Sequence, residues 1–186
     1  MKLVIFFIIS AILLRLLPHV PNFAPITAIA LFGGAYLGRR TALILPLAIM
    51  IFSDYLLLYW TGNNFNFQKI YSPLSLFHDT TLFVWSSFLI SGLIGIYLSK
   101  RKTVLNTTFA SIIASLQFFI VTNFGVWAMT TMYPHTIAGL IQSYLMGIPF
   151  FRATILGDLF YTGAFFGSYE LVKLASKKYL LVNNIK

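Results

Sequence analysis

The sequence predicts an all-α integral membrane protein, a single transmembrane domain (residues 1–186) folded as a six-transmembrane-helix bundle with both termini in the cytoplasm. Its 186 residues are 59% hydrophobic and 17% aromatic, and only 9% are charged. A soluble domain carries about 25% charged residues, so this composition excludes a soluble globular fold. Disordered chains are poor in aromatic residues, so the 19 Phe and 10 Tyr exclude disorder as well.

Six apolar runs justify the six helices, because a helix needs about 20 apolar residues to cross the hydrocarbon core of a bilayer. The first run is closed by Pro18, the second ends at Gly38, and the third contains one carboxylate, Asp54. The fourth ends at Lys100, the fifth has no charged residue, and the sixth contains a second carboxylate, Asp158. The predicted helices are residues 3–17, 25–37, 41–60, 80–98, 109–132 and 149–174.

Basic residues determine the predicted orientation. The chain has 13 Lys and Arg against 4 Asp and Glu, a net charge of +9 that on a soluble protein would suggest a nucleic-acid partner. Here we expect no nucleic acid, because short cytoplasmic loops of membrane proteins are enriched in Lys and Arg. Six crossings place both termini on one side, and ten of the thirteen basic residues fall there: Lys2, Arg39, Arg40, Lys100, Arg101, Lys102, Lys173, Lys177, Lys178 and Lys186.

Uncharged polar residues collect on the opposite, outer side. The predicted outer connections are residues 18–25, 61–79 and 133–148, and all three histidines lie on them. Loops that are longer than the usual connection are often functional, whereas the inner connections are short and basic. We therefore expect the functional surface to face outward.

Two aspartates lie within the predicted crossings, where a charged side chain costs roughly 2.5 to 3.5 kcal/mol on insertion scales. Asp54 falls in the third helix and Asp158 in the sixth. Two interpretations stay open at this point. The carboxylates either form structural ion pairs, such as Arg15 with Asp54 or Arg152 with Asp158, or they bind a ligand.

Two helix faces combine groups that suit a polar ligand. Helical spacing puts Thr154, Asp158 and Tyr161 on one face of the sixth helix. On the fifth helix, Asn123 lies four positions before Trp127, which puts an amide and an indole on the same face. An amide beside an aromatic ring suits a planar polar ligand, and it suits helix packing equally well.

Small residues recur at four-residue spacing, which lets helix backbones approach closely in lipid. We expect most of these faces to hold the bundle together, and one of them is a candidate docking face for another membrane subunit. The spaced residues are Gly34 with Gly38, Ser87 with Ser91 and Gly95, Ala110 with Ala114, and Gly163 with Gly167.

Enzyme chemistry finds little support in the sequence. An intramembrane aspartyl protease needs two carboxylates that share a proton, and Asp54 with Asp158 is the available pair, but Leu156 stands where that family has glycine. The chain has no cysteine, no Gly-x-Ser-x-Gly motif and no phosphate-binding glycine loop. His78 and Asp79 with another histidine are candidate metal ligands, but nothing in their spacing shows that they converge on one site. We expect no enzyme activity and no intrinsic cofactor, with an intramembrane hydrolase as the alternative of this class.

Six segments read RLLPHVPNFAP (15–25), ALFGGAY (30–36), TNFGVW (122–127), MYP (132–134), GIPFF (147–151) and GDLFY (157–161). In these segments the chain resembles small proteins of the bacterial inner (cytoplasmic) membrane, the S components of energy-coupling-factor vitamin transporters, near the solitary cobalamin-binding type. S components are substrate-binding subunits. The resemblance implies a multi-pass six-helix bundle whose ligand cavity opens outward and is capped by the loops after the first, third and fifth helices. It also implies a bundle that tilts to carry its ligand across, with a transmembrane coupling subunit and paired ATPases as partners.

The resemblance implies uptake of a vitamin-sized ligand, with cobalamin or a related corrinoid as the first candidate. Two departures matter. The first is that the chain has no cysteine thiolate to coordinate cobalt, so His78 or His135 is the candidate cobalt ligand in its place. The second is that the small-residue docking patch of the first helix is missing, because the residue four positions after Ala11 is Arg15. The alternative is a non-transporting accessory or scaffold protein in the bilayer. The predicted ligand-binding residues are Asn22, His78, Asn123, Trp127, His135, Arg152 and Asp158.

Overall fold

The computed structural model describes residues 2–16, 22–64 and 78–183, and every regular element among them is a helix. The all-α prediction is therefore confirmed for this part of the chain, while residues 18–21 and 65–77 of the predicted outer connections lie outside the described residues. The elements are α1 (Lys2–Leu16), α2 (Ile26–Phe32), the π-helix η1 (Gly33–Leu37), α3 (Arg39–Asn64), α4 (Thr81–Leu98), α5 (Val104–Met129) and α6 (Ile137–Asn183).

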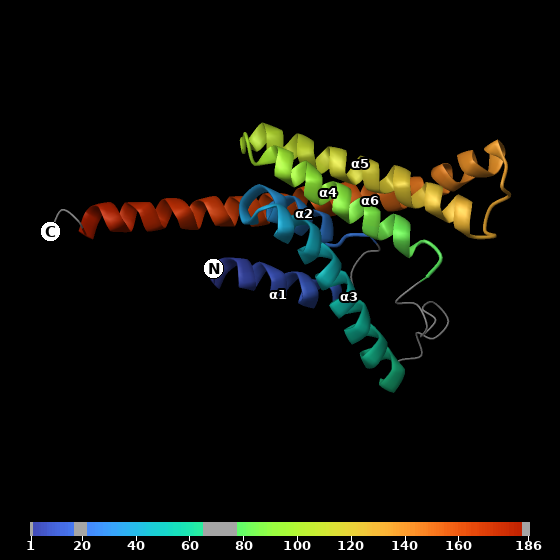
Figure 1. Cartoon of the computed structure of the whole chain (residues 1–186), viewed down its shortest axis with the longest axis horizontal. Helices are drawn as coiled ribbons and strands as arrows, with labels where there is room; N and C mark the ends of the chain where they lie inside the picture. The colour runs from blue at the N-terminus through green and yellow to red at the C-terminus, as the bar shows by residue number, and fades with distance from the viewer. Residues whose placement is uncertain (1, 17–21, 65–77, 184–186) are drawn as a thin grey trace.

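Three long helices form the body of the molecule. Figure 1 shows α4, α5 and α6 running alongside one another, with α4 and α5 antiparallel. α5 packs most extensively against α6 and then α4, while α2 and α3 both pack against α4. α3 slants away from this group, α1 lies against α3 and α2, and α6 extends past the other helices toward the C terminus (Figure 1).

The observed helices follow the predicted runs closely at α1 and α4 and differ most at α6. α6 is 47 residues long and begins at Ile137, so the prediction of a loop over 137–148 is wrong. Pro149 lies inside this helix, where proline removes one backbone hydrogen bond. Contact with α5 holds the added turns, because Ser143 Oγ donates a hydrogen bond to the Asn123 carbonyl at 2.9 Å.

Local backbone chemistry explains two other boundaries. α5 begins before predicted residue 109 because Thr103 caps it, with the Asn106 amide donating to Thr103 Oγ1 at 3.2 Å. The second predicted helix is divided into α2 and η1, and it ends at Gly38, whose φ of +94° favours glycine. The chain then enters α3 directly.

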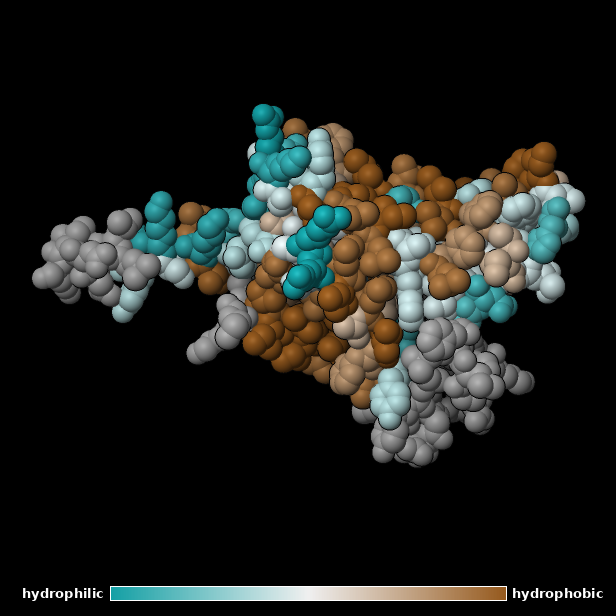
Figure 2. Space-filling model, in the orientation of Figure 1, coloured by the Kyte–Doolittle hydropathy of each residue, from teal (hydrophilic) through white to brown (hydrophobic). Residues whose placement is uncertain are grey.

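α5 is built inside out compared with a helix of a soluble protein. Its hydroxyl residues Thr107, Ser111 and Ser115 are buried against the neighbouring helices. Large apolar side chains occupy the exposed face at helical spacing, and they are Phe109, Ile113, Leu116, Ile120 and Phe124. α4 follows the same pattern, with Ser87 and Ser91 buried. Figure 2 shows the resulting hydrophobic surface over the middle of the molecule, with hydrophilic side chains mostly toward its ends.

Helix length separates these two helices from the N-terminal pair. By length and apolar composition, α4 and α5 qualify as membrane-spanning helices among the described residues. The apolar segments Val4–Leu16 and Ile26–Leu37 are shorter than the roughly 20 residues a crossing needs. The structure therefore supports two candidate membrane spans directly, and the six crossings predicted from sequence exceed that number.

Glycines bring α2, η1 and α3 into backbone contact with α4. A Cβ added at Gly95 would collide with the backbone of Leu31, and one added at Gly34 would collide with the backbone of Gly92. The predicted packing role is confirmed at these positions and at Ala110 and Ala114, which are buried. Gly163 and Gly167 differ, because nothing lies within 4 Å of a Cβ added at either position.

Specific contacts identify the two ends of the bundle. At one end, Lys102 Nζ donates to the Ala35 carbonyl at 3.4 Å and Tyr36 donates to Glu170 Oε1 at 2.7 Å. These contacts join the basic turn between α4 and α5 to η1 and to the later part of α6. At the opposite end, the Phe83 and Phe124 rings lie 6.0 Å apart, so α4 begins where α5 ends. We call these the basic end and the hairpin end.

Candidate functional site

Among the described residues, the most deeply buried acidic or basic side chain is that of Asp158. Its residue is 1% exposed, and Ser115 Oγ donates to its Oδ2 at 2.7 Å. The Thr27 hydroxyl is a second hydrogen-bond partner. Ser115 Oγ also lies 3.0 Å from the Ser111 carbonyl, and Thr162 Oγ1 donates to Ser111 Oγ at 3.3 Å. Side chains from α2, α5 and α6 therefore form one buried group, which we call the Asp158 cluster.

The connection between α1 and α2 covers this cluster at the middle of α6. A Cβ added at Gly157 would lie 3.1 Å from Phe23 Cα, so the Phe23 backbone rests on α6 one residue before Asp158. The Phe23 ring also contacts the Tyr161 ring, with centroids 5.5 Å apart. Ser115 lies near the middle of α5, so the described part of this connection reaches half-way along α5 rather than its hairpin end.

The predicted face of α6 is confirmed, and of the two ion pairs considered in the structural interpretation, the one between Arg152 and Asp158 does not form. Thr154, Asp158 and Tyr161 are all buried on that face. Arg152 is exposed instead of pairing with Asp158, and it makes no ion pair with any described residue. Arg152 lies two positions before Thr154, so its side chain leaves the helix on a different face.

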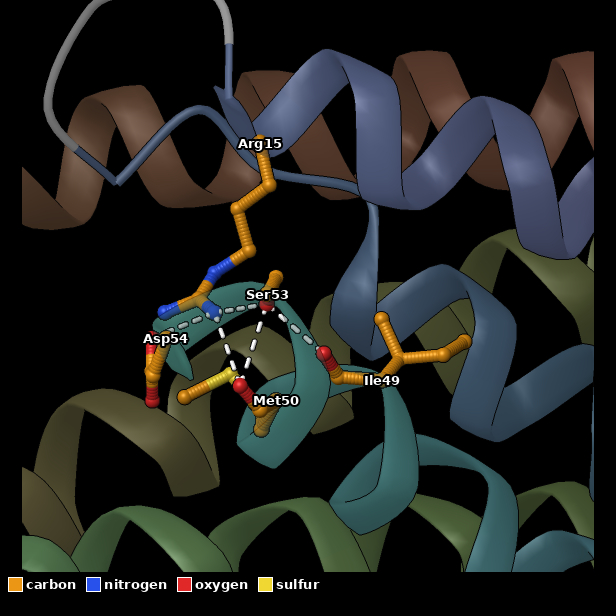
Figure 3. A network of polar contacts seen from close by, with 5 residues as sticks. All are labelled: Arg15, Ile49, Met50, Ser53 and Asp54. Carbon is orange, nitrogen blue, oxygen red and sulfur yellow. Dashed lines mark hydrogen bonds and ion pairs between the residues drawn. The ribbon is translucent and has the colours of Figure 1, made fainter. Parts of the chain in front are cut away.

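Asp54 forms an ion pair with Arg15, as the structural interpretation of this carboxylate predicted. The Arg15 Nη1 and Asp54 Oδ1 atoms lie 2.7 Å apart, and the two side chains are 17% and 25% exposed. Figure 3 shows the guanidinium also reaching Ser53 Oγ and the Met50 carbonyl of α3. Ser53 Oγ is 2.6 Å from the Ile49 carbonyl. The two acids thus bind different partners on different helices, and they do not share the site that a proton-sharing pair requires.

Asn123 and Trp127 connect α5 to the start of α6. The Asn123 Nδ2 donates to the Phe119 carbonyl at 2.8 Å, and the Asn123 side chain fills the space above Gly147. Trp127 Nε1 donates to the Pro134 carbonyl at 3.0 Å. Of the two interpretations of this amide and indole, these contacts favour helix packing.

The remaining predicted ligand-binding residues are exposed. His135 lies 5.9 Å from Trp127 between ring centroids and 3.2 Å from the Thr130 carbonyl through Nε2. His78 Nδ1 lies 2.9 Å from Thr80 Oγ1, just before α4. Asn22 is exposed with φ of +64°. Among the described residues, the structure brings together Trp127 and His135, and no contact links them to Asn22, His78, Arg152 or Asp158.

Sequence reasoning missed the hydroxyl residues of the Asp158 cluster. Ser115 and Thr27 bond the carboxylate itself, whereas Ser111 contacts Ser115 and Thr162 contacts Ser111. A signal was present, because Thr107, Ser111 and Ser115 repeat every four residues within an apolar run. Gln117 is another polar residue of α5, and it is partly buried. Its Nε2 donates to the Ser87 carbonyl and to Ser91 Oγ, and its Oε1 is buried without a partner among the described residues.

The described residues also contain an apolar groove of about 610 Å³ between α1 and α3. Ile8 and Ile12 line one wall and Leu45, Phe52 and Tyr55 line the other. A binding site for a vitamin needs a few polar groups that fix its orientation, and the groove offers mostly aliphatic and aromatic carbon. No three His, Asp or Glu side chains of the described residues form a group that could hold a metal ion.

One comparison with known proteins gives a match. A family model described as "Family of unknown function (DUF6580)" matches residues 1–180. No curated protein and no solved structure matches the chain.

Proposed function

This chain belongs to the family of unknown function DUF6580, and we propose that it is a multi-pass membrane protein that binds a vitamin-sized ligand for uptake. The observation that carries the proposal is the inside-out burial of α4 and α5, together with the buried carboxylate of Asp158 on α6. Hydroxyls of α4 and α5 and the Asp158 carboxylate of α6 are buried, while phenylalanines and isoleucines of α5 are exposed. Ionisable groups placed this way inside apolar helices usually mark a ligand or ion pathway.

In the proposed topology, α3, α4, α5 and α6 cross the membrane and the α1–α2 pair enters it half-way. This arrangement respects the short lengths of Val4–Leu16 and Ile26–Leu37 and the position of Phe23 against the middle of α6. Irregular backbone at membrane depth is tolerated where protein covers it. Lys2 and Arg39 then lie on the same side as the basic end, which the positive-inside rule places in the cytoplasm.

The hairpin end then faces outward and presents His78, Trp127 and His135. Imidazoles suit a ligand that carries a transition metal, and an indole offers an aromatic surface. Together with the resemblance to S components, these groups support cobalamin or a related corrinoid as the first ligand to test. Partners of the transport complex would be a transmembrane coupling subunit with ATPases, as the resemblance implies.

Ligand retention tests the carrier proposal directly. The protein would be purified in detergent after incubation with cobalamin, and the bound corrinoid would be read by visible absorbance and by native mass spectrometry. We expect retention to fall at least tenfold in H78A or H135A. Y97A is the matched control, because Tyr97 is an exposed aromatic residue at the basic end. If neither corrinoid nor any copurifying small molecule is bound, the carrier proposal is wrong.

A second candidate function is that of a non-transporting accessory protein. The observation that favours it is the open space above Gly163 and Gly167, which form a small-residue face that no described helix covers. Such faces allow close helix contacts in lipid. Under this function, G163L would reduce the size of the complex extracted in mild detergent while G163A would not, and corrinoid retention would be absent in the unmodified protein.

A further inference from the structure

The charge of Asp158 has no protein counter-charge in the described part of the chain. The ion pairs there are Arg15 with Asp54 and Lys173 with Glu170, so neither the exposed Asp79 nor the buried Asp158 has one. A buried carboxylate without a counter-charge is strongly unfavourable, and buried charges are normally paired or coordinate a metal ion. The chain has 13 Lys and Arg in total, so the missing partner does not reflect a shortage of cations.

The hydrogen-bond inventory of the cluster points the same way. Ser115 has one hydroxyl proton, but its Oγ faces two acceptors, Asp158 Oδ2 at 2.7 Å and the Ser111 carbonyl at 3.0 Å. Thr162 donates its hydroxyl proton to Ser111 Oγ. The single proton of Ser115 serves only one of its two acceptors at a time, so oxygen lone pairs in the cluster remain available to a cation.

The backbone geometry adds an independent reason. The connection between α1 and α2 is irregular at Phe23 and Ala24, and it meets α6 beside Asp158 at the middle of the bundle. In membrane transporters, short or broken helices that meet at mid-depth commonly form sites for coupling ions. The α1–α2 pair is short and apolar in this way.

We propose that the Asp158 cluster binds one sodium ion. Its ligands would be the Asp158 carboxylate, the hydroxyls of Thr27 and Ser115, and the Ser111 carbonyl, a set of hard oxygen atoms. A single carboxylate matches a single positive charge, whereas calcium sites usually combine several carboxylates. The inference goes beyond the proposed function, because it concerns an ion in the interior and is tested without any vitamin.

Thermal unfolding of the purified full chain in detergent tests the proposal. Sodium chloride would be exchanged for choline chloride or potassium chloride at constant ionic strength, so that screening stays the same. We expect the Tm to rise by about 3 to 5 °C for each tenfold increase of sodium above its Kd. Choline and potassium should give much smaller changes.

Three variants complete the test. D158N removes the charge in nearly the same shape, and we expect it to lose the sodium response. S115A should need at least tenfold more sodium for the same shift, which keeps the test informative if D158N fails to fold. T154V is the matched control, because Thr154 is buried on the same face but bonds only its own helix, to Phe150 O at 3.0 Å.

Two results would overturn the sodium site. The first is a wild-type Tm that is the same in sodium, potassium and choline, which would mean that a proton rather than sodium neutralises Asp158. The second is a sodium response that survives in D158N or that is lost equally in T154V. Neither result affects corrinoid retention, so this inference and the proposed function fail separately.

Discussion

The two interior acids show how partner groups decide the role of a residue. Asp54 has a guanidinium 2.7 Å away and is partly exposed, so it is held as a structural ion pair. Asp158 is 1% exposed and has only hydroxyl partners among the described residues. Both are aspartates within apolar runs, and the sequence gives them the same two interpretations. Their neighbours in the folded chain differ: Asp54 joins α3 to α1 through Arg15, whereas Asp158 has the surroundings of a cation site.

The Arg15–Asp54 pair should matter mainly for stability. R15L leaves the Asp54 carboxylate without its partner, and we expect the free energy of unfolding to fall by about 3 kcal/mol, since breaking a buried pair is costly. The double variant R15L/D54L should recover most of that loss, because replacing both partners with apolar groups is often nearly neutral. Thermal and denaturant unfolding in detergent would measure both variants.

Arg152 supplies the control for this prediction. It is an exposed arginine without an ion pair to any described residue, so R152L should change the Tm little. Equal losses in R15L and R152L would mean that general charge, rather than the Asp54 contact, stabilises the chain.

Among the elements, the contact of α4 with α2 and η1 depends on glycine. The backbones meet so closely that a Cβ at Gly95 or Gly34 would collide with main-chain atoms, which cannot move away as a flexible side chain could. In lipid, where apolar burial gives no drive for helix association, such close packing is one of the main sources of stability. Sequence spacing identified these glycines, but it identified Gly163 and Gly167 equally.

G95A should therefore destabilise the protein by about 1 to 3 kcal/mol, which is the usual range for overpacking. G163A is the matched control on α6. Nothing lies within 4 Å of its added Cβ, and alanine is about 1 kcal/mol better than glycine in a helix. We expect G163A to be neutral or slightly stabilising in the same unfolding assay. A similar loss in both variants would contradict the close contact at Gly95.

Taken as a whole, the molecule separates its charges by end. The basic end collects the turn at 99–103, the start of α3 and the later part of α6, while the hairpin end carries His78 and His135. This separation is what the positive-inside rule would produce, and it gives the orientation a direct test.

The chain has no cysteine, so single cysteine variants report on one position each. We expect M132C, in the exposed turn after α5, to react with a membrane-impermeant maleimide in intact cells. R101C, in the exposed turn before α5, should react only after the cells are permeabilised. The reverse pattern would place the basic end outside and would remove the basis for an outward-facing ligand site.

Composition and pattern by themselves determined the helical class, the apolar character of the chain and the approximate runs of α1 and α4. These features depend on the residues of one segment at a time, so they can be predicted without knowing which helices pack together. The continuation of α6 through Pro149 could not be read, because its stability comes from contact with α5.

The candidate site depended even more on tertiary structure. Asp158 was identified from sequence as an ionisable residue at depth, and Arg152, six positions earlier in the chain, was its candidate ion-pair partner under one of two interpretations. Ser115 of α5 and Thr27 of α2 reach the carboxylate only because α2, α5 and α6 meet at the middle of the bundle. Sequence spacing fixes which side chains share a helix face, while the packing of separate helices decides which faces meet.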